Sequence, residues 1–302
     1  MNILKTFFSV LILLVFCFMF GCVASKEKIK FAPELDKRAN YGKETQLTMK
    51  QAKLGPVTER VGLIIAPGRY KSTKIKDSGY IQESFEVILN TMDDKFYYVY
   101  STPSIQAKLA DNEKKIKRCL ASCGKNTLLV VFLGGKVKKV DEKYYLLSYD
   151  SKPEQISKTS LDLAKVLKTL DDAGCGRILI FADLYPDGKA PGELIKYLAN
   201  LPCFDKRYDL SQEMRLLVTN FSAKDKPYRF YIGFQGADIF SWHLAIGLRG
   251  QADKVLSGGN NDGKTSVDEL IQYIREEMAS SLVYKQKPAS IGNFSADTFI
   301  VK

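Results

Sequence analysis

Histidine is nearly absent from this chain, because His243 is the only one among 302 residues. Metal sites and catalytic dyads that depend on imidazole therefore have one candidate at most. His243 lies in the segment Phe240-Ser241-Trp242-His243-Leu244, which is typical of a helix with apolar neighbours. We expect a structural, hydrogen-bonded histidine there, and a dyad of His243 with Cys203 is the alternative.

Long apolar runs are also scarce, and the one at the start of the chain, Phe7 to Gly21, is too short to span a bilayer comfortably. Together with the basic start it predicts a signal peptide over residues 1–21. The run ends in Met19-Phe20-Gly21-Cys22, which is similar to the lipobox of bacterial lipoproteins. This resemblance implies attachment of lipid, palmitate included, at Cys22 and a place in the bacterial cell envelope. Alternatives are an ordinary secretory signal and an uncleaved anchor.

Val23 stands directly after the predicted lipidated cysteine, where an aspartate would signal retention at an inner membrane. In a bacterium with two membranes, this resembles the pattern of outer-membrane sorting. Residues 22–58 are polar and rich in lysine, and they predict a flexible tether. We therefore expect a membrane partner that is engaged through the N-terminal lipid.

Internal repeats are lacking, and from residue 59 to residue 302 apolar strands alternate with amphipathic helices. This order predicts one α/β domain with a mostly parallel sheet. The predicted strands cover 61–66, 96–100, 127–133, 177–184 and 216–221. The predicted helices cover 78–90, 103–122, 161–170, 194–201, 239–248 and 267–278, and a hairpin over 136–149 turns at Asp141-Glu142.

Two stretches at the ends of apolar runs, Phe132-Leu133-Gly134-Gly135-Lys136 and Phe181-Ala182-Asp183-Leu184-Tyr185, resemble the caspase and metacaspase family of cysteine peptidases. Segments in the family's order lie around them: Arg60 to Ile65, Tyr144 to Asp150, Gly247 to Asp253 and Asp262 to Leu270. The resemblance implies a three-layer caspase-like fold over residues 59–302, with helices on both faces of the sheet.

The resemblance also implies that the catalytic positions are vestigial. Members of the family carry a catalytic histidine after the first stretch and the nucleophilic cysteine after the second, and this chain has Gly135 and Tyr185 there. Glycine cannot transfer a proton, Lys136 is a poor base, and a phenol with a pKa of about 10 is a weak nucleophile. We expect an inactive binding or scaffolding module with no catalytic residue and no cofactor. A hydrolase that uses Cys203, or Tyr185 with Lys136, is one alternative. A purely structural envelope protein whose cleft is filled by its own side chains is another.

Two charged features near these positions suggest a protein partner. Asp183 stands where metacaspase-like members keep an acidic residue for a basic side chain, and it could instead satisfy local donors. The run Lys136 to Lys139 could accept an acidic surface, within a chain whose 45 basic and 34 acidic residues leave a net charge of +11. Nucleic acid is not an expected partner for an exported protein.

The four cysteines that follow Cys22 are Cys119, Cys123, Cys175 and Cys203, and they allow three disulfide pairings. Cys119 and Cys123 are four residues apart on one helix face, so a metal or redox pair is conceivable. Burial as small apolar side chains is the interpretation we favour.

The segment Gly258 to Glu269 has the spacing of a calcium loop, with Asn260, Asp262 and Glu269 at possible ligand positions. Gly258 occupies the first position, which is normally acidic. Ser266 and Glu269 also have the spacing of a helix capping box, and we favour the cap.

Overall fold

The computed structural model describes Leu54 and residues 56–96, 98–102, 104–186, 191–204, 213–218, 229–232, 235–280, 288–293 and 298–301. The predicted signal peptide, the lipidation site Cys22 and nearly all of the predicted tether lie outside these residues. Among the helices that are described, none combines the length and the apolar character needed to cross a membrane.

The central sheet follows from runs of apolar, often β-branched residues that are buried on both faces. Its main strands lie in the order β11-β7-β6-β3-β1-β2. The pairs among β1, β2, β3, β6 and β7 are parallel, and β11 is antiparallel to β7. The bounds are β1 Glu59–Ile65, β2 Tyr98–Ser101, β3 Thr127–Val140, β6 Arg177–Pro186, β7 Glu213–Val218 and β11 Ala289–Asn293.

Short strands extend this sheet and form two small ones. Strands β4 (Lys143–Leu146) and β5 (Leu161–Asp162) continue the central sheet from β3 by antiparallel pairing. Strand β8 (Arg229–Ile232) pairs with β9 (Gln235–Asp238), and β10 (Thr265–Ser266) pairs with β12 (Phe299–Val301).

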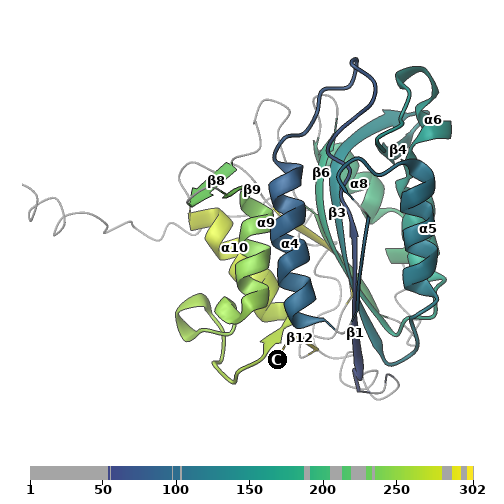
Figure 1. The fold of residues 1–302 in the computed structure, drawn as a ribbon. Helices are drawn as coiled ribbons and strands as arrows, with labels where there is room; N and C mark the ends of the chain where they lie inside the picture. Colours follow the sequence, from purple (N-terminus) through teal and green to yellow (C-terminus); the bar gives the residue numbers. More distant parts are fainter. Residues whose placement is uncertain are drawn as a thin grey trace, which may run out of the picture. The chain divides into compact units, whose positions relative to one another are not determined.

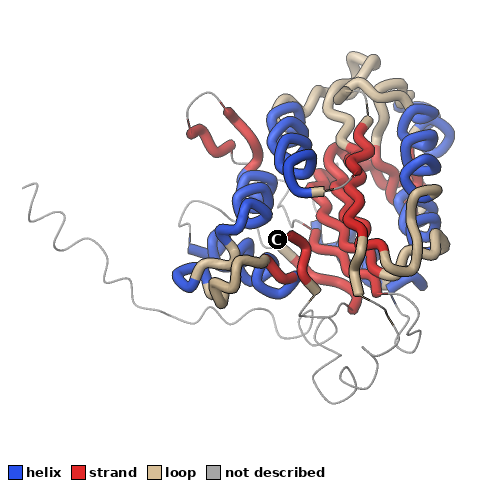
Figure 2. Tube along the Cα trace, turned by 60° about the horizontal axis from the view of Figure 1, so that its bottom comes forward, coloured by secondary structure: helices blue, strands red, loops and turns tan. Residues whose placement is uncertain are grey.

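Helices cover both faces of the sheet and complete three layers (Figure 1). Helices α4 (Ile81–Lys95), α9 (Ile239–Ile246) and α10 (Val267–Ser280) pack with one set of strand side chains. Helices α5 (Leu109–Leu120), α7 (Leu163–Asp171) and α8 (Pro191–Ala199) pack with the other set. The strands therefore lie between two layers of helices, as Figure 2 also shows.

The remaining helical segments are single turns. They are η2 (Pro153–Gln155), α6 (Ile156–Thr159), η3 (Pro202–Phe204), the π-helical turn η4 (Gly247–Gln251) and η5 (Val255–Ser257). The predicted three-layer α/β class with a mostly parallel sheet is thus confirmed.

The predicted hairpin after the third strand is confirmed, and its turn has the expected geometry. Asp141 and Glu142 have φ angles of 46° and 60°, as a two-residue hairpin turn requires. The turn links β3 directly to β4, so β3 is a single strand that ends at Val140 rather than at residue 133.

Several other predicted boundaries were wrong. Helix α4 covers Ile81–Lys95 and not 78–90, and β7 begins at Glu213 and not at residue 216. Helix α5 begins at Leu109 and not at residue 103, because the backbone N–H of Lys108 donates to the Asp111 carboxylate and that of Leu109 donates to Asp150. The predicted helix over 267–278 does not end the domain either. Strands β11 and β12 follow it, and their short lengths carry little periodicity.

Candidate functional site

The carboxyl ends of β3 and β6 lie side by side, where open α/β sheets usually bind ligands. Their parallel pairing continues through the positions of interest: Gly135 is paired with Leu184, and Lys136 with Tyr185. The structure therefore brings together the two stretches that sequence analysis singled out. Both belong to a continuous ladder of strand pairing at these positions.

Gly135 has no room for a side chain. Its φ angle is +135°, which L-residues rarely adopt, and a Cβ atom there would lie 2.6 Å from the carbonyl oxygen of Pro67 and 3.2 Å from Cδ1 of Leu146. The Pro67 oxygen is held in place, because Tyr70 Oη donates to it at 3.2 Å. The backbone N–H of Lys136 donates to the same hydroxyl at 3.3 Å. An imidazole at position 135 would require this loop to move.

Tyr185 serves as a hydrogen-bond donor in this site. Its hydroxyl donates to Oδ1 of Asp183 at 2.7 Å, and its ring lies 4.5 Å from the ring of Tyr80 between centroids. Burial, and then the charge of Asp183, raise the pKa of Tyr185 well above its usual value. The same two causes raise the pKa of Tyr80. Both phenols therefore stay protonated, and neither is suited to act as a nucleophile.

Asp183 is completely buried. Besides the bond from Tyr185, its Oδ2 accepts a hydrogen bond from Oγ of Ser241 in α9 at 3.4 Å. Its carboxylate thus satisfies donors inside the domain, which is the alternative that the sequence left open. It exposes no surface to a basic side chain of another protein.

A second buried carboxylate, Asp238, lies close to the same group, and sequence analysis did not find it. Its charge, like that of Asp183, contributes to raising the pKa of Tyr185. Asp238 caps α9, because its Oδ1 accepts from the Phe240 N–H at 2.8 Å, and its own N–H donates to Oγ of Ser84 at 3.0 Å. An aspartate directly before the apolar segment 239–246 was the sequence signal for this cap.

The lysine run beside the site divides between the two faces of β3. Successive strand residues point to opposite faces, so Lys136 and Lys138 follow the face of Asp183 and Tyr185, whereas Lys139 follows the other. Lys139 Nζ lies 2.9 Å from Glu142 and 3.8 Å from Glu193, and it lies over the ring of Tyr144. The charge of Lys139 is therefore partly balanced.

Cys203 and His243 do not form a dyad. Cys203 belongs to the core on the face covered by α5, α7 and α8, whereas His243 lies in α9 on the opposite side of the sheet. Nδ1 of His243 lies 3.5 Å from Oη of Tyr273, so the structural interpretation is confirmed. Burial lowers the pKa of His243 to about 4, and the ring is neutral at pH 7.

The four described cysteines are free thiols. Three of them gather at the opposite end of the sheet, near the beginnings of β3 and β6: Cys119, Cys123 and Cys175. Cys119 and Cys175 are buried in the core, as predicted, and Cys123 is partly buried. Cys203 is buried in the same core and lies in η3.

The capping box at the start of α10 is confirmed. Ser266 Oγ accepts from the Glu269 N–H at 3.2 Å, and Oε2 of Glu269 accepts from the Ser266 N–H at 2.9 Å. Glu269 Oε1 and Asp262 Oδ1 each accept a backbone N–H as well, and so does the side-chain oxygen of Asn260. Within the described ranges, no three His, Cys, Asp or Glu side chains are arranged to hold a metal ion.

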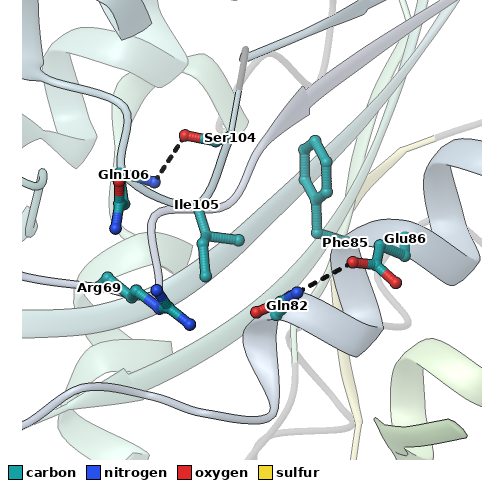
Figure 3. Close-up of a pocket in the computed structure, with 7 residues that line it drawn as sticks. All are labelled: Arg69, Gln82, Phe85, Glu86, Ser104, Ile105 and Gln106. Carbon is teal, nitrogen blue, oxygen red and sulfur yellow. Dashed lines mark hydrogen bonds between the residues drawn. The ribbon is translucent and has the colours of Figure 1, made fainter.

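A surface pocket of about 360 Å³ lies between the start of α4 and the loop after β2 (Figure 3). Phe85 and Ile105 provide its apolar part, and both are buried. Its polar lining comes from Arg69, Gln82, Glu86, Ser104 and Gln106. The backbone N–H of Arg69 donates to the Ile105 carbonyl, so the pocket adjoins the same loop whose Pro67 closes the Gly135 position.

Comparison with solved structures concerns the fold. The similarity to protein GSU0716 from Geobacter sulfurreducens covers 81% of this chain and 97% of that protein's chain, with 14% sequence identity and a TM-score of 0.51. Caspase-1 from Spodoptera frugiperda matches 82% of this chain and 91% of its own, at 13% identity and a TM-score of 0.48. The similarity to the Drosophila initiator caspase Dronc covers 80% of this chain and 82% of that protein's chain, with 11% sequence identity and a TM-score of 0.47.

At the level of sequence, no family of known proteins matches this chain. No curated protein matches it either. At these identities, the structural similarities bear on the arrangement of the helices and strands and not on catalysis or binding.

Proposed function

We propose that the chain is a catalytically inactive caspase-like domain, carried by a bacterial envelope lipoprotein, that binds a protein partner. The proposal that the domain is catalytically inactive depends mainly on the geometry of Gly135. The position that the family resemblance assigns to a catalytic histidine has a positive φ angle and no space for a Cβ atom. Any peptidase chemistry would need a base from elsewhere.

The nucleophile position supports the same proposal. The hydroxyl of Tyr185 keeps its proton and donates it in a hydrogen bond to Asp183. The same buried carboxylate also accepts a hydrogen bond from Ser241. Substituting a cysteine there would leave a buried carboxylate without its closest donor. Cys203, the nucleophile of the alternative dyad, lies across the sheet from His243.

The lysines that follow the Asp183 face, Lys136 and Lys138, are the part of the site that we propose to contact a partner. Both are partly exposed at the carboxyl end of the sheet. An acidic surface is the complementary chemistry. Asp183 is assigned the internal role of holding Tyr185 in place, since it is fully buried.

The inactive part is tested with the purified full chain, fluorogenic peptides that end in arginine or lysine, and a thiol-directed covalent probe, with and without calcium and reductant. We expect no cleavage from protein that circular dichroism shows to be folded. Cleavage that disappears in Cys203→Ala would overturn the proposal and support the alternative, a hydrolase with a displaced nucleophile.

The binding part is tested by crosslinking in native envelopes. We expect the charge reversal Lys136→Glu with Lys138→Glu to reduce recovery of the partner. The matched control is Lys168→Glu, an exposed lysine in α7. Equal recovery with both variants would exclude the Lys136–Lys138 surface, and recovery that is lost in Cys203→Ala would favour an enzyme instead.

A further inference from the structure

The amino ends of β3 and β6 carry two cysteine-bearing loops that are in close backbone contact. Cys123 precedes β3 and Cys175 precedes β6. The N–H of Gly176 donates to the Gly124 carbonyl at 3.2 Å. A Cβ atom at Gly176 would lie only 1.9 Å from the Lys125 carbonyl oxygen, so the two loops can approach this closely only with glycine at that position.

This approach brings three thiols together. The thiol of Cys123 lies within hydrogen-bonding reach of the thiols of Cys119 and Cys175, and its Sγ donates to the Cys119 carbonyl oxygen at 3.5 Å. Cys119 and Cys175 are 0% and 1% exposed, whereas Cys123 is only partly buried. Cys123 is therefore the member of the cluster that solvent and small molecules can reach.

The hydrogen bonds also divide the three thiols by reactivity. Bonds from Cys119 and Cys175 lower the pKa of Cys123, and the same bonds together with burial raise the pKa of the other two. The thiolate is the nucleophile in disulfide exchange. The accessible cysteine is thus also the one that ionises most readily, and two protonated thiols lie beside it.

We propose that Cys123 and Cys175 form a site for thiol–disulfide exchange with a disulfide-bonded molecule. Cys123 is the attacking residue, and Cys175 is the resolving residue.

The chemistry needs no further oxidant. The Cys123 thiolate attacks one sulfur of the incoming disulfide, a mixed disulfide forms, and the other sulfur leaves as a thiolate that takes a proton from water. Cys175 then attacks the Cys123 sulfur, and its proton passes to the departing sulfur, which leaves as the second thiol. The protein loses two hydrogens and two electrons, and the incoming disulfide gains them.

Cys175 is a better resolving residue than Cys119 for a geometric reason. Cys119 precedes Cys123 by four residues at the end of α5, where the N–H groups of Ser122 and Cys123 donate to carbonyls three residues back and continue the helical winding past Leu120. Residues four apart on a helix have Cβ atoms roughly 5–6 Å apart and side chains directed in parallel, whereas a disulfide needs Cβ atoms about 3.5–4.5 Å apart. Cys175 comes from a separate loop and faces Cys123 across the contact.

The test uses the full chain in its folded state and oxidised glutathione as the probe, followed by acid trapping and peptide mapping without reductant. In the wild type we expect a peptide pair linked through Cys123 and Cys175. In Cys175→Ser we expect glutathione to remain on Cys123. Cys119→Ser should still form the wild-type link.

Cys203→Ser is the matched control, because Cys203 is a buried thiol of the same core. It should change neither the product nor its rate. A link between Cys123 and Cys119, glutathione that stays on Cys123 of the wild type, earlier modification of Cys203, or no reaction of the folded chain would each overturn the proposal. Thermal unfolding of each variant verifies that it is folded.

Discussion

Close backbone contact has opposite consequences at the two ends of the β3–β6 pair: it leaves no room for a side chain at one end and brings cysteine side chains together at the other. At the carboxyl end, the Pro67 carbonyl occupies the space that a side chain at position 135 would need. At the amino end, contact of Gly176 with the Lys125 carbonyl brings Cys123 and Cys175 together. Glycine permits the approach in both places. The same property of the backbone excludes reactive side chains from one end and gathers them at the other.

The difference also concerns which groups can ionise. Two phenols at the carboxyl end have raised pKa values, because they are buried beside carboxylates. At the amino end, Cys123 has a lowered pKa, because neighbouring thiols donate to it. Caspase-like chemistry would be expected at the first end, yet the more reactive group lies at the second. Substitutions at either end of the β3–β6 pair test this difference.

The largest effect is expected from Gly176→Ala. The new Cβ atom would meet backbone atoms, which cannot rotate away, so we expect a loss of about 3 kcal/mol or more in the free energy of unfolding. Disulfide exchange between Cys123 and Cys175 should slow, because the loops must separate. Urea unfolding and the glutathione assay measure the two consequences.

The control for this substitution is Gly174→Ala, two residues away. Gly174 has a φ angle of +70°, but a Cβ atom there would meet nothing within 4 Å. We expect a loss of only about 1 kcal/mol from backbone strain. If both variants lost the same amount, close contact of the loops would not be the cause.

Gly135→Ala tests the carboxyl end. Positive φ and the contact with the Pro67 oxygen should together reduce the free energy of unfolding by about 2–4 kcal/mol. The double variant Gly135→His with Tyr185→Cys should be at least as unstable and show no peptidase activity. A stable, cleaving double variant would contradict our account of this end.

Tyr185→Phe removes one hydrogen bond from the same end. Asp183 would lose its 2.7 Å donor while still buried, and we expect a loss of about 1.5–3 kcal/mol. Ser241→Ala removes the longer bond of 3.4 Å to the same carboxylate and should cost less. Urea titrations of both variants give the ranking, and the reverse order would show that Ser241 is the principal donor.

The smallest effect concerns pH and α9, the helix that carries Ser241. Because the folded-state pKa of His243 is lowered to about 4, the unfolded chain binds the proton more readily between its usual pKa of about 6.5 and pH 4. Stability should therefore fall as pH decreases within this window, by about 1–2 kcal/mol between pH 7 and pH 5. His243→Gln should remove this part of the dependence, and parallel pH profiles for both proteins would show that His243 is not responsible.

Much of the fold could be predicted because strand runs and helical periodicity are local properties. The segments that became β1, β3, β6, α7, α9 and α10 show their patterns in uninterrupted sequence. The edge strand β11 was missed, since five residues that contain a glycine give little alternation. The start of α5 was also misplaced, because it depends on Asp150, which lies 41 residues further along the chain.

The sequence by itself determined the α/β class, the hairpin at Asp141-Glu142, the cap at Ser266 and the presence of glycine and tyrosine at the two positions of the caspase resemblance. These depend on residue type and on neighbours close in the chain. Only the tertiary structure decided the rest: Pro67 against Gly135, Ser84 bonded to Asp238 across 154 residues, and Cys123 beside Cys175. Such contacts join distant segments, and they form only when the whole sheet sets how its strands are paired.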